Sequence, residues 1–318
     1  MTSQEAEQLF GQMLDGAMSD AEISDVLISL ADRGENAEDI VGAVRAMRAR
    51  MVRVDAPEDA IDVCGTGGDG SHSLNVSTAV AIVVAACEVP VAKHGNRAAS
   101  SQAGAADTLE ALGLNLDRAA ETAEASLADL GICFLFAQKH HPALARIAPV
   151  RRALGRRTIF NLIGPLANPA EVRRQLIGIP TPDLIPIYAE ALHQLNIERA
   201  MIVSGREGLD EISISGDTEI ATIGFDLHSH NINPAEFALM VHGKDAIKGG
   251  DAAFNAAALT RLLLGEKGAY RDAVLLNAAA ALIVAGRVNT VADGIEEATE
   301  ALDRGLAKTL MDCWIAYQ

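Results

Sequence analysis

Apolar positions in the first part of the chain recur at the three- and four-residue spacing of amphipathic helices, and residues 1–52 hold three such stripes. Ser19 and Glu22 form a capping-box pattern before the second stripe, and Gly34 follows it as a C-terminal stop. Asn36 can cap the third stripe. We therefore expect a small helical domain or arm, whose apolar stripes pack on another element or another subunit.

From about residue 60 the pattern changes to short apolar runs separated by helical periodicity. The runs that predict strands lie at 60–64, 89–92, 132–136, 175–179 and 200–203. The helical patterns lie near 75–86, through Leu109 and Leu112, and at 185–195. Strands that alternate with helices predict an α/β sheet with parallel strands.

Two segments do not follow this alternation. Residues 140–173 carry His140, His141 and a group of arginines, and we expect helices and turns that return to the helical domain. Residues 252–310 are predicted to be helical. The two histidines are interpreted as structural, because no His-Glu-x-x-His metal motif accompanies them.

The charge of the chain narrows the functional classes. With 318 residues and 49% apolar residues, the chain can bury a substantial core. Its formal net charge of −17 opposes binding to nucleic acid and to anionic membrane surfaces. The same charge repels small anions, so an anion site must be a local feature built from a few cations and backbone N–H groups.

The cysteines and the N-terminus point to an intracellular protein. The spacing of the four cysteines fits neither a zinc knuckle nor a redox pair, so we expect buried, reduced thiols. Residues 1–5 lack the features of a signal peptide. The longest apolar run, residues 79–87, is too short to span a membrane and suits a buried helix.

Two neighbouring segments could hold a phosphate. The sequence GTGGDG at residues 65–70 follows a predicted strand, and such glycines let successive N–H groups point at one anion. A plain strand-to-helix turn explains these glycines about as well. Asn75, Ser77 and Thr78 open the next helix, where they could cap it or place hydroxyls on a phosphate or a metal.

Three further features could supply charge to such a site. Residues 93–101, with the sequence KHGNRAASS, form a polar loop between an apolar strand and an apolar helix. Asp210 and Glu211 are adjacent carboxylates on a loop, which suits Mg²⁺, although paired surface acids are common. Arg151 could hold a carboxylate through two hydrogen bonds, or lie on a solvated basic helix face.

Taken in order, these segments resemble the anthranilate phosphoribosyltransferases of tryptophan biosynthesis, within the nucleoside phosphorylase and phosphoribosyltransferase group. The resemblance covers nearly the whole chain. The matching strings are DVCGTGGDG at 62–70, NVST at 75–78, KHGNR at 93–97, ADTLEALG at 106–113, APVR at 148–151, FNLIGPL at 160–166, GLDEIS at 208–213 and GGD at 249–251.

The resemblance implies a small all-helical domain hinged to a larger α/β domain with a mostly parallel central sheet. The helical domain would comprise residues 1–60 plus approximately 148–172. The α/β domain, which binds phosphoribosyl pyrophosphate (PRPP), would comprise residues 61–147 plus approximately 173–318. It further implies a cytoplasmic homodimer joined through the helical domains, without nucleic-acid or membrane partners.

The resemblance also implies a reaction and its site residues. The chain would transfer the 5-phosphoribosyl group of PRPP to the amine of anthranilate, with two Mg²⁺ ions. The implied PRPP contacts are Gly65, Gly68, Asp69, Ser73, Asn75, Val76, Ser77, Thr78, Lys93, His94, Gly95, Asn96, Arg97, Ala98, Ala99, Ser100 and Ser101. The implied anthranilate contacts are Gly65, Asn96 and Arg151, and the implied metal ligands are Ser77, Asp210 and Glu211.

Two departures and two rival functions accompany this interpretation. Ala105 stands where many members have a hydroxyl, and Ser204 where they often have histidine. A pyrimidine nucleoside phosphorylase would share the architecture and the glycine loop, but it would not need the acidic pair Asp210 and Glu211. A non-catalytic nucleic-acid binder would need a basic groove, which the net charge opposes.

Overall fold

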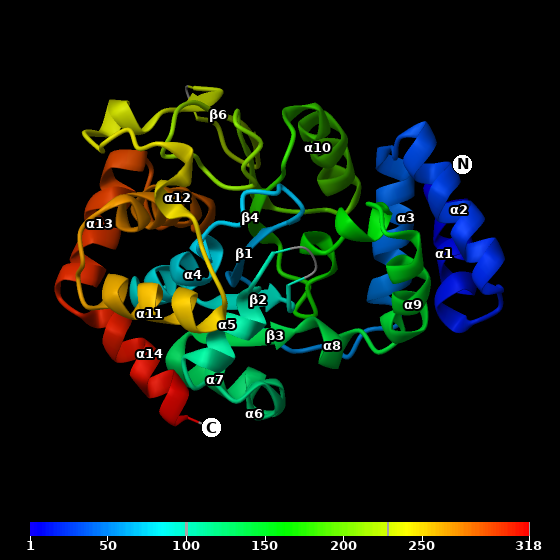
Figure 1. The fold of residues 1–318 in the computed structure, drawn as a ribbon, viewed down its shortest axis with the longest axis horizontal. Coiled ribbons are helices and arrows are strands. Elements are labelled where there is room, and N and C mark those ends of the chain that lie inside the picture. The colour runs from blue at the N-terminus through cyan, green and yellow to red at the C-terminus, as the bar shows by residue number, and fades with distance from the viewer. Residues whose placement is uncertain (99–100, 228, 318) are drawn as a thin grey trace.

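The N-terminal part of the chain is a group of three helices. In the computed structural model, which describes residues 1–98, 101–227 and 229–317, these are α1 (Ser3–Asp15), α2 (Asp20–Arg33) and α3 (Ala37–Arg48), on the right of Figure 1. The predicted capping box at Ser19 and Glu22 is confirmed, and Gly34 and Asn36 flank α2 and α3 as predicted. The described helices include none that is both long and apolar enough to cross a bilayer.

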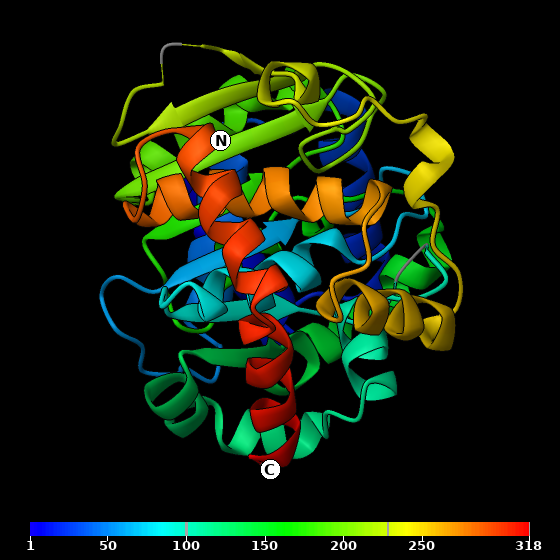
Figure 2. The same ribbon diagram turned by 90° about the vertical axis from the view of Figure 1, so that its left-hand side faces the viewer.

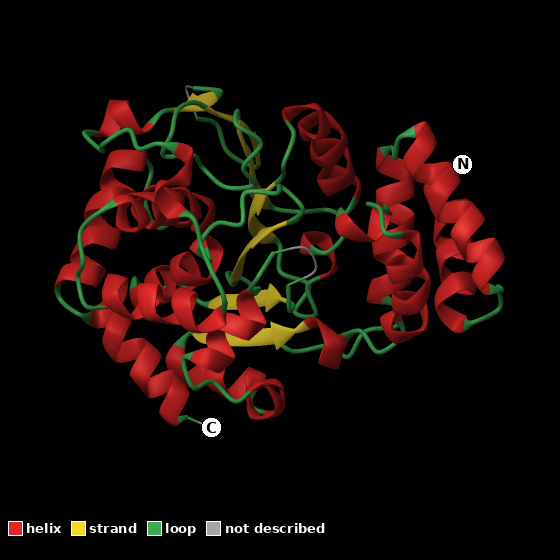
Figure 3. Ribbon diagram, viewed as in Figure 1, coloured by secondary structure: helices red, strands yellow, loops and turns green. Residues whose placement is uncertain are grey.

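The rest of the chain is built on one seven-stranded sheet, the yellow arrows of Figure 3. Its strands are β1 (Ile61–Gly65), β2 (Val91–Gly95), β3 (Ile132–Phe136), β4 (Arg174–Gly178), β5 (Arg199–Gly205), β6 (Thr218–Ile223) and β7 (Asn231–Ile232). Their spatial order is β3-β2-β1-β4-β5-β6-β7. The first five run parallel, β6 pairs antiparallel with β5, and β7 pairs antiparallel with β6, so the predicted mostly parallel sheet is confirmed.

Helices cover both faces of this sheet. Following the first strands come α4 (Val76–Ala86), α5 (Ala105–Ala111), α6 (Leu116–Glu121), α7 (Ala123–Leu130), α8 (Ala137–His140) and α9 (Leu144–Leu154). Later helices are α10 (Ile185–Gln194), α11 (Ala252–Leu263), α12 (Ala269–Ala285), α13 (Val291–Asp303) and α14 (Leu306–Ala316). Short 3₁₀ turns lie at Ile159–Asn161, Pro165–Ala167, Pro182–Leu184, Pro234–Phe237 and Lys244–Ile247. In Figure 2, α12, α13 and α14 cross the face of the sheet turned toward the viewer.

The two faces of the sheet bury different cores, because successive strand residues point to opposite sides. In β5, Met201 and Val203 belong to the core around α4 and α12. Ala200 and Ile202 belong to a second core, shared with α1–α3 and α10. The N-terminal helices are therefore packed into the same apolar layer as one face of the sheet.

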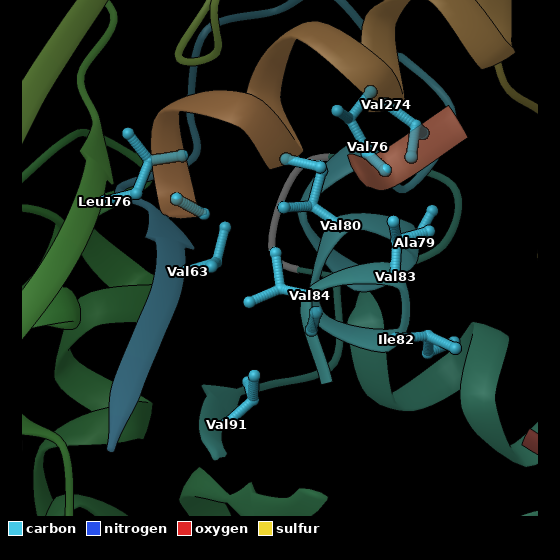
Figure 4. Packing of buried hydrophobic residues seen from close by; sticks show 14 of the residues in the cluster. Val63, Val76, Ala79, Val80, Ile82, Val83, Val84, Val91, Leu176 and Val274 are labelled. Carbon is cyan, nitrogen blue, oxygen red and sulfur yellow. The ribbon is translucent and has the colours of Figure 1, made fainter. Parts of the chain in front are cut away.

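Helix α4 packs against β1, β2 and α12, and α12 in turn packs against β4 and β5. Its residues include five β-branched apolar ones, a type that favours helix weakly, so burial rather than intrinsic propensity holds this helix. Figure 4 shows the residues that meet around it, which include Val76, Val80, Val83 and Val84 of α4, Val63 of β1, Val91 of β2, Leu176 of β4 and Val274 of α12. This packing fixes the start of α4 beside the end of β1.

The sheet topology places a site at one edge. The chain moves outward from β1 through β2 to β3, then returns to β4 on the other side of β1. In open α/β sheets, ligands bind at the carboxyl ends of the strands where the order reverses in this way. Four of these parallel strands, β1, β2, β4 and β5, end in glycine, which leaves room at that edge.

Candidate active site

A cavity of about 340 Å³ opens at the carboxyl ends of β1 and β2. Its walls come from the α/β part of the chain and from the helical segments around α3 and α9. The α/β part contributes residues 64–77, most of the loop after β2, and the pair Asp210 and Glu211. The other wall includes Met47 of α3, Arg151 of α9, and Phe160 and Asn161 of the connection that follows α9. Segments that are distant in the sequence therefore meet in one cleft.

The predicted phosphate turn is an open glycine loop at the end of β1. Gly67, Gly68 and Gly70 have φ angles of 69°, 77° and 69°, in the left-handed region that glycine adopts without strain. Space around Gly67 and Gly68 is free, since an added Cβ at either would meet nothing within 4 Å. The amide of Gly67 donates to Oδ2 of Asp210 at 2.7 Å, which ties the loop to the acidic pair.

Asp210 occupies a space that two glycines leave open. Gly65 and Gly178 are paired in register at the ends of β1 and β4. A Cβ on Gly65 would lie 2.3 Å from Oδ2 of Asp210, and one on Gly178 would lie 1.6 Å from its backbone oxygen. Gly178 was not among the predicted site residues, because its importance depends on a contact with a residue 32 positions later in the chain.

Three carboxylates crowd this corner of the cleft. Burial and the nearby carboxylate of Asp69 raise the pKa of Asp210 to about 7. Burial and the charge of Asp210 raise the pKa of Glu211 well above its usual range. The Oδ2 atom of Asp69 is buried and has no hydrogen-bond partner among the described residues. The corner is thus short of positive charge, which is the condition that a bound divalent cation relieves.

Lys93 lies beside this corner and is almost completely buried, with 2% of its surface exposed. Its Nζ donates to the backbone oxygen of Val63 at 2.8 Å and to Oγ of Ser77 at 3.4 Å. The charge of Lys93 and the backbone amide of Ser77 both lower the pKa of Glu211, although burial and Asp210 outweigh them. Ser77, Lys93 and Glu211 therefore form one group at the start of α4.

Asn75 holds the start of α4 in place through its own contacts. It occupies the N-cap position but makes no side-chain capping bond, so the simple capping interpretation is wrong for this residue. Its Oδ1 instead accepts from Oγ1 of Thr108 at 2.5 Å and from Nδ2 of Asn255 at 2.9 Å. Its backbone oxygen accepts from the hydroxyl of Tyr270 at 3.0 Å. The side-chain oxygen is thus already occupied by protein donors.

Residues of the loop after β2 line the cleft, and Arg97 among them also contacts the adjacent helix α5. Asn96 and Arg97 are exposed and line the cavity. Arg97 also forms ion pairs with Asp107 at 2.8 Å and Glu110 at 2.9 Å. Ala98 and Ser101 line the cavity as well, whereas Ala99 and Ser100 lie outside the described residues.

His94 and His141 place two unpartnered acceptors near the cleft. Burial and the neighbouring His141 hold the pKa of His94 well below its usual range, and burial lowers the pKa of His141 to about 4. Nδ1 of His94 lies 3.1 Å from the backbone oxygen of Gly164, which fixes its proton there. Nε2 of each ring is buried without a hydrogen-bond partner among the described residues. Sequence reasoning gave His141 no chemical role, but it lines the cavity.

Arg151 is the cation of the opposite wall. Its guanidinium lies 5.5 Å from the ring centroid of Phe160, and its Nη2 is 3.4 Å from Oδ1 of Asn161. Within residues 1–98, 101–227 and 229–317 it forms no ion pair, so a ligand carboxylate would meet no competing protein acid. The side chain is only partly buried, and burial lowers its pKa.

Most of the remaining predicted contacts line the cavity, but Thr78 does not. Gly65, Gly68, Ser73, Val76 and Gly95 line the cavity. Thr78 is buried, with 1% exposure, and is not among the described residues that line it. The cysteines are all free thiols as predicted, but Cys313 is exposed and Cys64 is only partly buried, so the prediction of burial is right for Cys87 and Cys133 alone.

Sequence reasoning also missed the buried support of β1 and β2. The carboxylate of Asp62 accepts from the amide of His94 at 3.2 Å and from Nδ2 of Asn168 at 2.8 Å. Burial raises the pKa of Asp62 to about 6. Asp62 lies in a quoted motif, but no local signal identifies a partner 106 residues away.

The charged lining of the cleft is balanced rather than positive. Three cations, Lys93, Arg97 and Arg151, face three acids, Asp69, Asp210 and Glu211. Across the described ranges, no three His, Cys, Asp or Glu side chains are arranged to hold a metal by themselves. An ion here would need Ser77, water and substrate oxygens as further ligands, which is how Mg²⁺ is commonly bound.

Two family models together match most of the chain. Residues 57–308 match the α/β domain of a glycosyl transferase family, and residues 1–51 match the helical bundle domain of that family. The anthranilate phosphoribosyltransferase of Novosphingobium aromaticivorans is 63% identical over 313 residues, covering 98% of this chain and 95% of that protein.

Solved structures agree with this match. The anthranilate phosphoribosyltransferase of Thermus thermophilus superposes with a TM-score of 0.93 at 39% identity, covering 100% of this chain and 95% of that one. The enzyme of the same name from Saccharomyces cerevisiae, solved in complex with PRPP and Mg, has a TM-score of 0.90 at 27% identity. That alignment covers 99% of this chain and 93% of the yeast chain.

Proposed function

Because the chain belongs to the anthranilate phosphoribosyltransferase family, we propose that its cleft joins anthranilate to PRPP. The reaction gives N-(5-phosphoribosyl)anthranilate and pyrophosphate and belongs to tryptophan biosynthesis. The observation that carries the proposal is the arrangement of the cleft. A glycine loop and a crowded acidic corner lie on one wall, and the guanidinium of Arg151, which pairs with no acid in the described part of the chain, lies on the other.

Site residues are assigned from the predicted set. We propose that the PRPP contacts are Gly65, Gly68, Asp69, Ser73, Asn75, Val76, Ser77, Thr78, Lys93, His94, Gly95, Asn96, Arg97, Ala98, Ala99, Ser100 and Ser101. Gly65, Asn96 and Arg151 would contact anthranilate. The position of most of these residues on the cavity wall supports the assignment. Asn75 would act through its backbone and its support of α4, since its side-chain oxygen is already bonded.

The acidic corner is the proposed magnesium site. Ser77, Asp210 and Glu211 would hold the metal, and we expect two ions when PRPP is bound. The raised pKa of Asp210, about 7, supports this choice because burial and the nearby carboxylate of Asp69 both make an uncompensated negative charge costly there. When bound, magnesium neutralises the pyrophosphate that leaves the ribose.

The protein's own residues then orient the two substrates. Lys93 offsets phosphate charge, and the open glycine loop turns backbone N–H groups toward the diphosphate. Arg151 holds the anthranilate carboxylate, which leaves the amine to face C1 of the ribose. The aromatic amine is already neutral near pH 7, so no residue is assigned as a general base. Orientation of this kind can supply about 7–11 kcal/mol of the barrier reduction.

Arg151→Ala tests the anthranilate assignment, with Arg152→Ala as its control on the same helix. Arg152 is exposed and is not among the described residues that line the cavity. Loss of one charge-assisted contact should raise the KM for anthranilate by about 10- to 100-fold in the Arg151 variant, with the KM for PRPP nearly unchanged. Equal effects of the two substitutions on anthranilate would exclude the assignment.

Domain organisation and assembly complete the proposal. Residues 1–60 plus approximately 148–172 would form one domain and the remainder the other, with closure of the cleft excluding water from PRPP. The helical domains would join two copies in a homodimer. A cytoplasmic location is supported by the cysteines, none of which forms a disulfide.

A further inference from the structure

A second pocket, of about 230 Å³, lies where the segment around Lys248 meets α11 and the start of α12. In Figure 1, α11 and α12 are on the left of the molecule, opposite α1–α3. Leu74 lines this pocket and also the catalytic cleft. The two spaces therefore share one residue of the segment that leads into α4.

The charge of this pocket is opposite to that of the chain. Its lining carries four cations and one acid, which are Lys248, Arg261, Lys267, Arg271 and Glu266. Arg261 pairs with Glu266 at 3.2 Å, which leaves a surplus of three cations in the lining. The whole chain has a net charge of −17, and the lining of the catalytic cleft has equal numbers of cations and acids. The pocket is thus a local positive region of the kind that attracts a small anion.

Arg271 keeps one donor without a partner among the described residues, although it also forms an ion pair. Its side chain is 3% exposed, and Nη2 forms an ion pair with Asp303 at 2.6 Å. Asp303 also pairs with Lys267 at 3.3 Å, so one carboxylate serves two cations. Nη1 of Arg271 is buried and has no hydrogen-bond partner among the described residues. A buried donor of this type is costly unless an acceptor reaches it.

The start of α12 adds a second source of positive potential. This helix has 17 residues, and Gly268 at its N-cap position supplies no side-chain capping bond. The first N–H groups of a helix have no intrahelical partner, and its dipole is positive at this end. Ala269, Tyr270 and Arg271 all line the pocket. The positive end of α12 and the guanidinium of Arg271 therefore lie at the same pocket.

We propose that this pocket binds a phosphate group, as free phosphate, pyrophosphate or the phosphoryl group of a sugar phosphate. A helix N-terminus with arginine and lysine side chains is a recurrent phosphate-binding arrangement. A bound anion would restrain Tyr270, whose hydroxyl donates to the backbone oxygen of Asn75 at the start of α4. The site is separate from the proposed catalytic contacts, yet it is linked to them by this hydrogen bond.

Titration calorimetry with inorganic phosphate, at constant ionic strength and without anthranilate, tests this proposal. The test variant is Lys248→Gln with Arg261→Gln, because both residues are exposed and the fold should tolerate the loss of their side chains. We expect the wild-type chain to bind phosphate in the millimolar range or tighter, and the double variant to lose one class of sites or bind it about tenfold more weakly.

Matched controls separate a site from general charge. The control variant is Lys244→Gln with Arg304→Gln. Lys244 is an exposed lysine four residues before Lys248, and Arg304 is an exposed arginine that pairs with a glutamate, as Arg261 does. Together they remove the same charge outside the pocket, and we expect wild-type binding. Equal loss in this pair and in the test variant, or unchanged binding in the test variant, would overturn the proposal.

Repeating the titration with pyrophosphate and with ribose 5-phosphate identifies the preferred source of the phosphate group. The preferred ligand is the one whose affinity depends most on the pocket substitutions. Since binding is measured without turnover, the outcome does not depend on the proposed transferase activity.

Discussion

Asp210 lies where two neighbouring strands end without side chains. Gly65 and Gly178 leave the space that its backbone and carboxylate occupy, and the amide of Gly67 then bonds that carboxylate. The position of the acidic pair is thus decided by glycines on β1 and β4 as much as by its own loop. This arrangement makes two predictions at the scale of single residues.

Gly178→Ala should displace Asp210, because the new Cβ would lie 1.6 Å from its backbone oxygen. A misplacement of about 1 Å can cost about 100-fold in rate, and the overpacking should destabilise the fold by about 1–3 kcal/mol. Steady-state turnover and denaturant unfolding measure both effects. Gly216→Ala is the control, since its Cβ would meet nothing within 4 Å. Similar activity of the two variants would contradict this account of the acidic corner.

Magnesium binding should depend on pH through Asp210, whose pKa is raised from 3.8 to about 7. A raised pKa favours the protonated folded state, so the stability that this group contributes is lost as pH rises from about 4 through about 7. The metal needs the deprotonated form, so its apparent affinity should rise through about pH 7 and then level off. Titration at about pH 6 and pH 8 should differ about tenfold in wild type.

Asp210→Asn is the control for this pH dependence. The variant lacks the titrating group, so the unfolding midpoint of the metal-free protein should become less sensitive to pH between about 4 and 7. A wild-type magnesium affinity that is flat across pH 7 would contradict the assigned role.

Sequence reasoning at this scale found residues whose chemistry is local. The glycine loop, Lys93 and the adjacent pair Asp210 and Glu211 carry their signal in their own segment, and the structure brings them together. Gly178 and the bond between Asp62 and Asn168 could not be identified, because their partners lie far away in the sequence.

At the scale of elements, the start of α4 depends on side chains from three other segments. Thr108 of α5, Asn255 of α11 and Tyr270 of α12 all bond Asn75. Asn255 also accepts from the amide of Gly250, so it joins the GGD motif to the helix start. These bonds explain why α4 begins at a fixed place although its N-cap lacks a side-chain capping bond.

Asn255→Ala should therefore loosen the start of α4. Asn255 is 2% exposed, and its loss leaves buried polar partners unsatisfied, which typically costs about 1–3 kcal/mol. Chemical denaturation measures this cost, and the KM for PRPP should rise in parallel. Asn231→Ala, at an exposed asparagine of β7, should change stability by less than about 0.5 kcal/mol. A neutral Asn255 variant would show that these bonds do not support the site.

The element pattern was predictable where burial was uniform. All five parallel strands were predicted, and the majority of their boundaries differ from the prediction by one or two residues. The predictions did not include β6, β7, α6 and α7. Strand β6 mixes buried and partly exposed residues, and α6 has only six residues, so neither gives a clear period.

At the scale of the whole molecule, the cleft depends on how the two parts of the chain pack. Met47 and Arg151 face the glycine loop because the core of α1–α3 continues into one face of the sheet. Periodicity predicted the helices and the sheet, but the placement of Arg151 opposite the acidic corner was expected from the family resemblance alone. Local sequence carries no measure of that distance.

Assembly is a prediction at the same scale. If the helical domains join two copies, sedimentation equilibrium should give twice the chain mass of 33.3 kDa. A separately expressed chain that begins after α3 should then fail to form dimers if it folds. A dimer of that shortened chain would place the interface elsewhere.

The most direct test of the central claim is the fluorescence of anthranilate during the reaction. With enzyme, PRPP and Mg²⁺ present, we expect fluorescence to fall, with one pyrophosphate released for each anthranilate consumed. Omission of Mg²⁺ should stop the change, and Asp210→Asn with Glu211→Gln should slow it by about 100-fold or more. Unchanged fluorescence with the complete wild-type mixture, or equal rates with and without the acidic pair, would contradict the account.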